Sequence, residues 1–389
     1  MFIPLSRTTM DEREVDAAAR AIRSGWVTQG PEVERFEQMF AEAVGAPHAC
    51  ACASGTAALH LALIAAGVGP GDEVITVSHS FIATANSIRY CGALPVFVDI
   101  DAATFNIDVT LIEAVITPRT RAILCVHQLG MPCDLGAIVA IAARHGLRVI
   151  EDAACAAGSE ILIDGRWERI GRPHGDIACF SFHPRKVLTT GDGGMVTTRD
   201  AAMDHRVRQL RQHGMNVPAH VRHTTRTVVR ESYDELGFNY RLTDIQAAIG
   251  QVQVDRLPTI VAERRRLAAR YADLLGNSGV VTPVEPAWAR SNWQTYCVWL
   301  PDGVEQAAVM AGMRDRGVAT RAAVMNAHRE PAYPPGTWRC AAPLLTSERA
   351  RDRAIQLPLF PGLAESEQDR VAEALAHVID EARAAAVFQ

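Results

Sequence analysis

The pattern of hydrophobic and polar positions alternates between helix-like and strand-like stretches from Ala51 to Thr198. Longer stretches of apolar and helix-forming residues predict helices, and short runs rich in Val, Ile and Phe predict buried strands. The expected helices are residues 57–66, 81–90 and 135–145. The expected strands are residues 73–77, 94–98, 122–126, 148–150, 177–182 and 195–198. Strands regularly separated by helices indicate an α/β fold with a mostly parallel sheet, in which ligands bind at the carboxyl ends of the strands.

The character of the chain changes near Asp255. A helix rich in Arg and Ala is expected from about residue 257 to residue 275, and it resembles a connector. The elements expected beyond it are a strand at residues 295–300, a helix at 304–316 and a strongly periodic final helix at 365–385. We therefore predict a large domain over residues 1–255 and a smaller α+β domain over residues 256–389.

Composition and charge exclude several classes of protein. The 389 residues carry a net charge of only −5, and the basic residues are scattered, so no nucleic-acid partner is expected. No apolar run reaches the length of a membrane span, and the first residues lack the pattern of a signal peptide. We expect a cytoplasmic protein whose nine cysteines are reduced thiols.

His48, Cys50, Cys52 and His60 lie close together in the sequence and invite comparison with a zinc site. Their spacing matches no common zinc pattern, and small buried cysteines are frequent in protein cores. We interpret them as core residues and expect no bound metal.

Three short segments place reactive side chains at predicted strand ends. Residues 149–154 form a strand that ends in Glu151 and Asp152, and residues 179–186 form a strand that leads to Lys186. The glycine-rich residues 191–194 follow. The third segment, Ser-Gly-Thr-Ala at residues 54–57, is a small-residue turn that opens a helix. Each has an ordinary explanation alone: an acid capping the next helix, a solvated lysine and a plain N-cap.

Together, the three segments match what a Schiff-base cofactor needs. A lysine amine forms the imine, and a carboxylate keeps a pyridine nitrogen protonated so that the ring accepts electrons. Backbone N–H groups at a helix N-terminus bind a phosphate dianion. Gly55 allows the backbone to approach closely, and Thr56 offers a hydroxyl.

The same segments resemble the signature of the DegT-type nucleotide-sugar aminotransferases. The similarity extends over almost the whole chain, through residues 26–31, 36–37, 237–242, 247–250 and 357–360. The resemblance implies pyridoxal 5′-phosphate (PLP) as cofactor and the PLP fold type I, with a large domain built on a mostly parallel seven-stranded sheet.

The resemblance also implies roles for individual residues. Lys186 would form the Schiff base and shuttle a proton, Asp152 would pair with the pyridine nitrogen, and Phe81 would stack on the ring. Asn239 would reach the phosphate of the partner subunit, which makes the active unit a homodimer. The other phosphate ligands implied are Gly55, Thr56, Ala57 and Ser181.

Cys155 departs from the commoner pattern. Many members have His or Gln there, hydrogen-bonded near the phenolic oxygen of the cofactor, and a thiol is a weaker donor. For the substrate site, the resemblance points to a segment that contains His328, although a surface histidine in a Pro-rich loop is an equally good explanation. The further substrate candidates are Tyr333, Arg241 and Thr28.

These roles imply a ping-pong transamination, in which L-glutamate gives its amino group and a keto-sugar nucleotide receives it. A cyclitol or other carbocyclic ketone is an alternative acceptor. A PLP-dependent sugar dehydratase is less favoured, because those enzymes typically carry His at the position of Lys186.

Two other classes fit the sequence less well. A nicotinamide dehydrogenase would need its glycine motif between a strand and a helix, whereas residues 67–71 lie between a helix and a strand. A non-catalytic PLP-binding regulator could lack the lysine or carry a DNA-binding domain, and neither is seen.

Residues 216–232 are either a substrate-contacting loop or, as we favour, a solvated surface loop.

Overall fold

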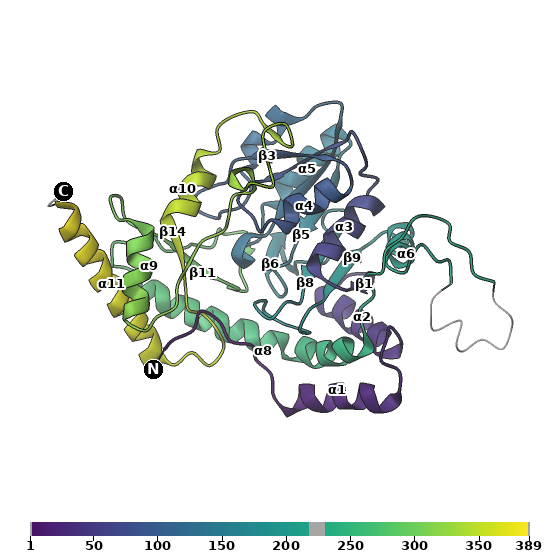
Figure 1. The fold of residues 1–389 in the computed structure, drawn as a ribbon, viewed down its shortest axis with the longest axis horizontal. Coiled ribbons are helices and arrows are strands. Elements are labelled where there is room, and N and C mark those ends of the chain that lie inside the picture. The colour runs from purple at the N-terminus through teal and green to yellow at the C-terminus, as the bar shows by residue number, and fades with distance from the viewer. Residues whose placement is uncertain (1, 218–229, 388–389) are drawn as a thin grey trace.

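The centre of the described protein is an eight-stranded sheet, one strand more than the seven that the resemblance implies (Figure 1). The computed structural model describes residues 2–217 and 230–387. Residues 218–229 of the predicted loop at 216–232 therefore lie outside the described residues. In spatial order the strands are β1 (His48–Cys52), β9 (Gly194–Thr198), β8 (Ile177–Ser181), β5 (Arg148–Asp152), β4 (Thr120–Val126), β2 (Glu73–Val77), β3 (Leu94–Val98) and β13 (Arg339–Cys340).

The sheet is parallel from β8 to β13, whereas β9 runs antiparallel to both of its neighbours. The central strands are buried on both faces, which explains why they read as short continuous apolar runs. All six strands predicted between residues 73 and 198 are present, so the predicted α/β class is confirmed.

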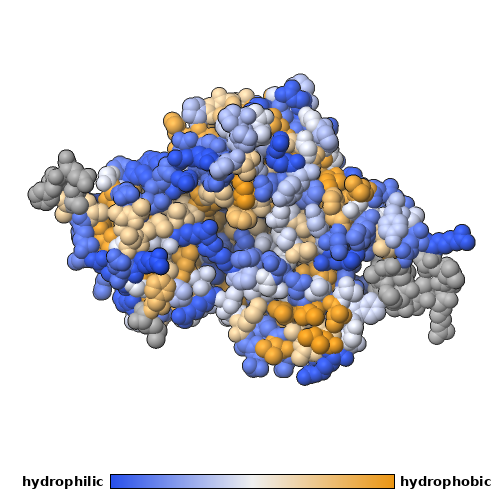
Figure 2. All heavy atoms as spheres, viewed as in Figure 1, coloured by the Kyte–Doolittle hydropathy of each residue, from blue (hydrophilic) through white to orange (hydrophobic). Residues whose placement is uncertain are grey.

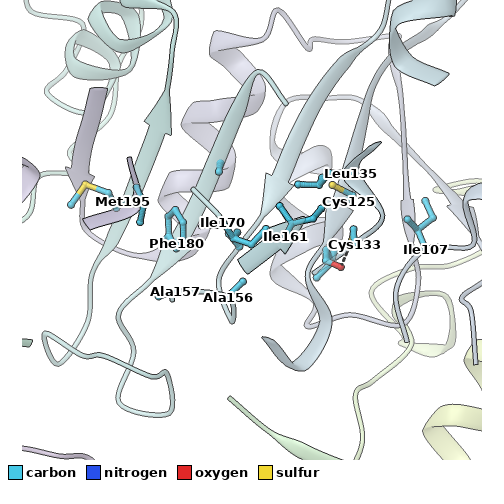
Figure 3. Close-up of a cluster of buried hydrophobic side chains, with 14 of the residues drawn as sticks. Ile107, Cys125, Cys133, Leu135, Ala156, Ala157, Ile161, Ile170, Phe180 and Met195 are labelled. Carbon is cyan, nitrogen blue, oxygen red and sulfur yellow. Dashed lines mark hydrogen bonds between the residues drawn. The ribbon is translucent and has the colours of Figure 1, made fainter. Parts of the chain in front are cut away.

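Helices cover both faces of the sheet. On one face, α2, α5 and α8 pack against the sheet in a core that includes Phe36, Phe180 and Leu257, part of which Figure 3 shows. On the other face, α3, α4 and α6 enclose a second core around Leu61 and Ile150. The helices are α1 (Glu12–Ser24), α2 (Pro31–Val44), α3 (Gly55–Ala65), α4 (Ala83–Tyr90), α5 (Leu135–His145), α6 (Ala201–Leu210) and α8 (Asp244–Leu275).

Helix α8 is longer than the sequence pattern indicated. Its N-cap is Thr243, which forms a capping box with Gln246, and it runs 32 residues through Pro258 to Leu275. The predicted start near residue 257 is therefore wrong by about a dozen residues, because packing against α1 and α2 holds the earlier turns. The expected division between residues 255 and 256 falls inside this continuous helix.

Beyond α8, a smaller α+β unit has its own core, which includes Tyr271, Tyr296 and Phe360. Its three-stranded sheet has the order β11 (Tyr296–Trp299), β14 (Ala354–Leu357), β12 (Arg321–Ala322). Its helices are α9 (Gln306–Asp315), α10 (Leu345–Arg353) and α11 (Glu365–Val387). A second small sheet has the order β10 (Ala289–Arg290), β6 (Glu160–Ile163), β7 (Arg166–Arg169).

The eighth strand of the main sheet comes from this C-terminal part of the chain. Arg339 of β13 donates to Glu73 Oε2 at 2.5 Å and to the Val115 carbonyl at 2.6 Å. Glu73 is only 1% exposed and also accepts hydrogen bonds from Thr117 and Arg119. A buried, fully hydrogen-bonded carboxylate thus anchors a strand of only two residues.

Over residues 2–217 and 230–387, no helix is both long and apolar enough to cross a membrane.

Candidate active site

The parallel strands bring the predicted reactive residues to one edge of the sheet. Asp152 is the last residue of β5 and Ser181 the last of β8, while Ser80 and Phe81 follow β2 closely. Because β2, β4, β5 and β8 are parallel, these carboxyl ends lie together. This is the edge where ligands bind in open α/β sheets.

Lys186 lies in the loop after β8, and its side chain turns back over the end of β5. Its backbone N–H donates to the His183 carbonyl at 2.8 Å, which closes a tight turn. Its Nζ donates to Cys155 Sγ at 3.1 Å. Cys155 is three residues beyond Asp152, so the structure brings the predicted amine, thiol and carboxylate into one neighbourhood.

Asp152 is 4% exposed, and both of its carboxylate oxygens accept hydrogen bonds. Oδ2 accepts from Thr84 Oγ1 at 2.7 Å, and Oδ1 accepts from the Ala154 N–H at 3.2 Å. Each carboxylate oxygen has a second lone pair, so the group can still accept a hydrogen bond from a protonated ring nitrogen.

The start of α3 forms a cradle against the ends of β8 and β9. Ser54 caps the helix by accepting from the Ala57 N–H at 3.1 Å, while Gly55 and Thr56 belong to the first turn, whose N–H groups lack helical acceptors. A Cβ on Gly55 would lie 2.7 Å from Ser181 Cβ, and a Cβ on Gly194 would meet the Ser54 carbonyl. The helix start therefore touches the strand ends directly, a fit for a bound phosphate.

Phe81 lies on the loop between β2 and α4, and its ring is 64% exposed. An exposed phenylalanine beside a buried carboxylate fits the ring-stacking role that the resemblance implies. The preceding residues of this loop are held by the C-terminal part of the chain. His328 Nδ1 lies 2.6 Å from Ser78 Oγ, and His79 Nδ1 lies 2.9 Å from Asn326 Oδ1.

The predicted substrate residues do not all reach solvent. The His328 ring lies between Ser78 and Glu348, whose Oε1 is 3.0 Å from His328 Nε2. Tyr333 is buried and donates to Asn86 Oδ1 at 2.7 Å. Burial raises the pKa of Tyr333 to about 12, so its hydroxyl remains a neutral donor. Both side chains therefore have structural partners within the chain.

The other predicted residues lie near the α1–α2 and α6–α8 connections. Thr28 is exposed, and its carbonyl accepts from the N–H of Asp244 at the start of α8. Arg241 is half-buried. Asn239 is exposed, and its backbone pairs with Gln212.

Several residues that the sequence did not single out also belong to this neighbourhood. Thr84 donates to Asp152, and Ser80 in turn lies 2.8 Å from the Thr84 hydroxyl. From the C-terminal part, Asn292 Nδ2 donates to the Cys155 carbonyl at 2.8 Å, and Gln294 Nε2 donates to the Arg185 carbonyl at 2.9 Å. They fix the backbone on both sides of the amine–thiol contact.

The amino-acid composition also singles out Lys186. Lysine and arginine together number 39 in the full sequence, and Lys186 is the only lysine among them. Arginine serves every other basic position, yet a guanidinium cannot replace a primary amine as a carbonyl-directed nucleophile. This single lysine contacts Cys155, three residues beyond Asp152 at the end of β5.

A lysine amine, a buried carboxylate and a phosphate cradle at the strand ends of this fold define a PLP-dependent enzyme of fold type I. Comparison with known proteins agrees with this class. The model of the DegT/DnrJ/EryC1/StrS aminotransferase family matches residues 8–376. The chain belongs to that family, and it is a PLP-dependent transaminase.

Solved structures show the same similarity over whole chains. The aminotransferase TlmJ from Streptoalloteichus hindustanus is 33% identical, with a TM-score of 0.88 over 97% of this chain and 99% of that one. DesV from S. venezuelae, in complex with a ketimine intermediate, is also 33% identical, with a TM-score of 0.87 over 97% and 99%. The PLP-form of the putative sugar aminotransferase Spr1654 from Streptococcus pneumoniae is 25% identical, with a TM-score of 0.88 over 98% and 100%.

Proposed function

We propose that this transaminase moves the amino group of L-glutamate to the ketone of a nucleotide-linked sugar by a ping-pong mechanism. The observation that carries the proposal is the only lysine of the chain, placed with Asp152 at the strand ends of an aminotransferase fold. Lys186 also disfavours a dehydratase, because the family resemblance implies His at this position in the dehydratases. A carbocyclic ketone such as a cyclitol remains the alternative acceptor.

When bound, PLP supplies a conjugated ring that accepts the electron pair released at the substrate carbon. Lys186 Nζ would carry the proton between that carbon and the cofactor, as general base and then as general acid. Asp152 would hold the proton on the ring nitrogen, and the first turn of α3 with Ser181 would bind the phosphate. Phe81 covers one face of the ring and excludes water from it.

The acceptor class is supported by the relatives, since Spr1654 is described as a putative sugar aminotransferase. His328, Tyr333, Arg241 and Thr28 remain candidates for substrate contacts, of which Thr28 is exposed and Arg241 half-buried.

A second subunit is part of the proposal. Large apolar side chains are exposed along α1, where Val15 and Ile22 are more than half exposed, and Figure 2 shows this apolar area. Leu236 is 88% exposed and lies three residues before Asn239. Burial of such side chains against another copy would carry Asn239 towards the partner's phosphate cradle.

The test is the absorbance of the purified enzyme with PLP before and after excess L-glutamate, with Lys186→Ala alongside. A visible band that glutamate shifts to the near-ultraviolet, and that Lys186→Ala lacks, supports the donor half-reaction. Borohydride reduction followed by peptide mass spectrometry should place the cofactor on Lys186. Keto-sugar nucleotides and cyclitol ketones are then compared as acceptors, and a preference for the cyclitols would overturn the sugar assignment.

A band that is unchanged in Lys186→Ala would contradict the role of the lysine. A normal band that does not respond to glutamate would contradict glutamate as the donor, while leaving the cofactor assignment intact.

A further inference from the structure

A chain of hydroxyl groups leads to the buried carboxylate of Asp152. Ser80 Oγ lies 2.8 Å from Thr84 Oγ1, and Thr84 Oγ1 lies 2.7 Å from Asp152 Oδ2. The exposed fractions are 4% for Ser80 and 1% for Thr84, so these groups are shielded from bulk water. Such buried hydrogen bonds act in a low local dielectric.

The direction of the hydrogen bonds in this chain follows from chemistry. An ionised carboxylate has no proton to give, so the Thr84 hydroxyl must be the donor to Asp152. A hydroxyl has only one proton, and therefore the Thr84 oxygen must accept from Ser80. The protons thus point in one direction, from Ser80 through Thr84 to Asp152.

The backbone around Thr84 is firmly held, so its hydroxyl has a fixed position. Its N–H donates to the Phe81 carbonyl at 3.1 Å, and Ser87 Oγ donates to its carbonyl at 2.8 Å. Thr84 is the second residue of α4, so the N-terminal end of this helix lies beside the carboxylate. The Ala154 N–H fixes the other oxygen at 3.2 Å.

We propose that Thr84, supported by Ser80, is a positioning residue that orients the ionised Asp152 carboxylate towards the pyridine nitrogen of PLP. With each oxygen tied to one protein donor, the carboxylate cannot rotate, and its remaining lone pairs keep a fixed direction. The inference rests on the proposed pairing of Asp152 with that nitrogen. The segment from Ser80 to Thr84 would then have two roles at the cofactor, because Thr84 orients Asp152 and Phe81 stacks on the ring.

The test measures the dissociation constant of PLP from the apoenzyme in a double-mutant cycle. Thr84→Val keeps the shape of the side chain and removes the donor. We expect it to weaken PLP binding about 10-fold, the lower end of what a hydrogen bond to a charged group contributes. Thr84→Ser should retain affinity within about 3-fold, since the donor remains. In an Asp152→Ala background, Thr84→Val should cause no further loss.

The chain offers a matched control in Thr76 of β2. Thr76 is fully buried, and its Oγ1 has no hydrogen-bond partner among the described residues. Thr76→Val should leave PLP affinity unchanged. Circular dichroism and thermal unfolding of each apoenzyme show that the variants fold, and Ser80→Ala provides a second, milder perturbation expected to weaken binding less than Thr84→Val.

Unchanged PLP affinity in Thr84→Val, or an equal loss with and without Asp152, would overturn the positioning role alone. Unchanged affinity in Asp152→Ala would overturn both this role and the proposed role of Asp152. The absorbance of bound PLP as a function of pH gives a second readout. Its titration should shift in Thr84→Val and return in Thr84→Ser.

Discussion

Gly55→Ala tests the phosphate cradle with the smallest possible change. The added Cβ would lie 2.7 Å from Ser181 Cβ and 3.3 Å from Ser181 Cα, and ordinary contact begins at 3.4 Å. The start of α3 or the end of β8 must then move by about 0.7 Å, and overpacking of this kind costs about 1–3 kcal/mol. That exceeds the gain of about 1 kcal/mol from alanine in a helix.

The same movement separates the predicted phosphate ligands from one another. We expect the PLP dissociation constant to rise at least about 10-fold, because a shift of this size breaks hydrogen bonds to a charged group. The measurement is a titration of apoenzyme with PLP by absorbance, with the thermal unfolding of the apoenzyme recorded in parallel.

Gly136→Ala is the matched control. Gly136 lies in the first turn of α5, and its added Cβ would be 3.5 Å from the nearest heavy atom, an ordinary contact. It should leave PLP affinity unchanged and slightly raise stability. If Gly55→Ala had the same PLP affinity and thermal stability as Gly136→Ala, the expected crowding of the added Cβ against Ser181 would be refuted.

Three further changes probe other parts of the structure. Asp152→Asn should lower kcat at least about 100-fold in stopped-flow single turnovers, since the amide cannot stabilise a protonated ring nitrogen as an anion does; full activity would contradict the role of Asp152. o-Phthalaldehyde forms a fluorescent product with a neighbouring amine and thiol, so it should label Lys186 and Cys155 in the apoenzyme but not in Cys155→Ala, and bound PLP should prevent the labelling. Equal fluorescence of the unmodified apoenzyme and Cys155→Ala would contradict the 3.1 Å contact. Burial opposes the ionised form of Glu73, but Arg339, Thr117 and Arg119 outweigh it and lower its pKa to about 2. The stabilisation by Glu73 is therefore complete above pH 4.5 and is lost as the pH falls towards 2. Glu73→Gln should lower the free energy of unfolding by about 3 kcal/mol at pH 7 and make it depend less on pH below 4.5, as followed by circular dichroism. An unchanged pH dependence of unfolding in this range would contradict the stabilising role of Glu73.

The central strands could be predicted because each is a short apolar run bounded by turn residues. The full length of α8 could not, since Pro258 is typical of a helix start, and only packing against α1 and α2 continues the helix before it. Strand β13 has two residues and no pattern of its own. Its place depends on the ion pair between Arg339 and Glu73, which are 266 positions apart in the sequence.

In the site, Asp152 and Lys186 could be predicted because they occur together with a small-residue helix start within one α/β pattern. Thr84 could not, since a threonine in a helical stretch has no local feature that reveals a distant carboxylate partner. The partners of His328 and Tyr333 are similarly remote in sequence. Sequence alone could not therefore distinguish a packed side chain from one that contacts substrate.

The single lysine has a practical consequence for handling the enzyme. Apart from the α-amino group, the only side-chain amine of the chain is the Lys186 Nζ beside Cys155. Once the contribution of the α-amino group is subtracted, the stoichiometry of modification by an amine reagent counts the active sites that lack cofactor, without any substrate. Conjugation that must preserve activity should instead use surface carboxylates, because amine coupling would attach to the catalytic centre itself.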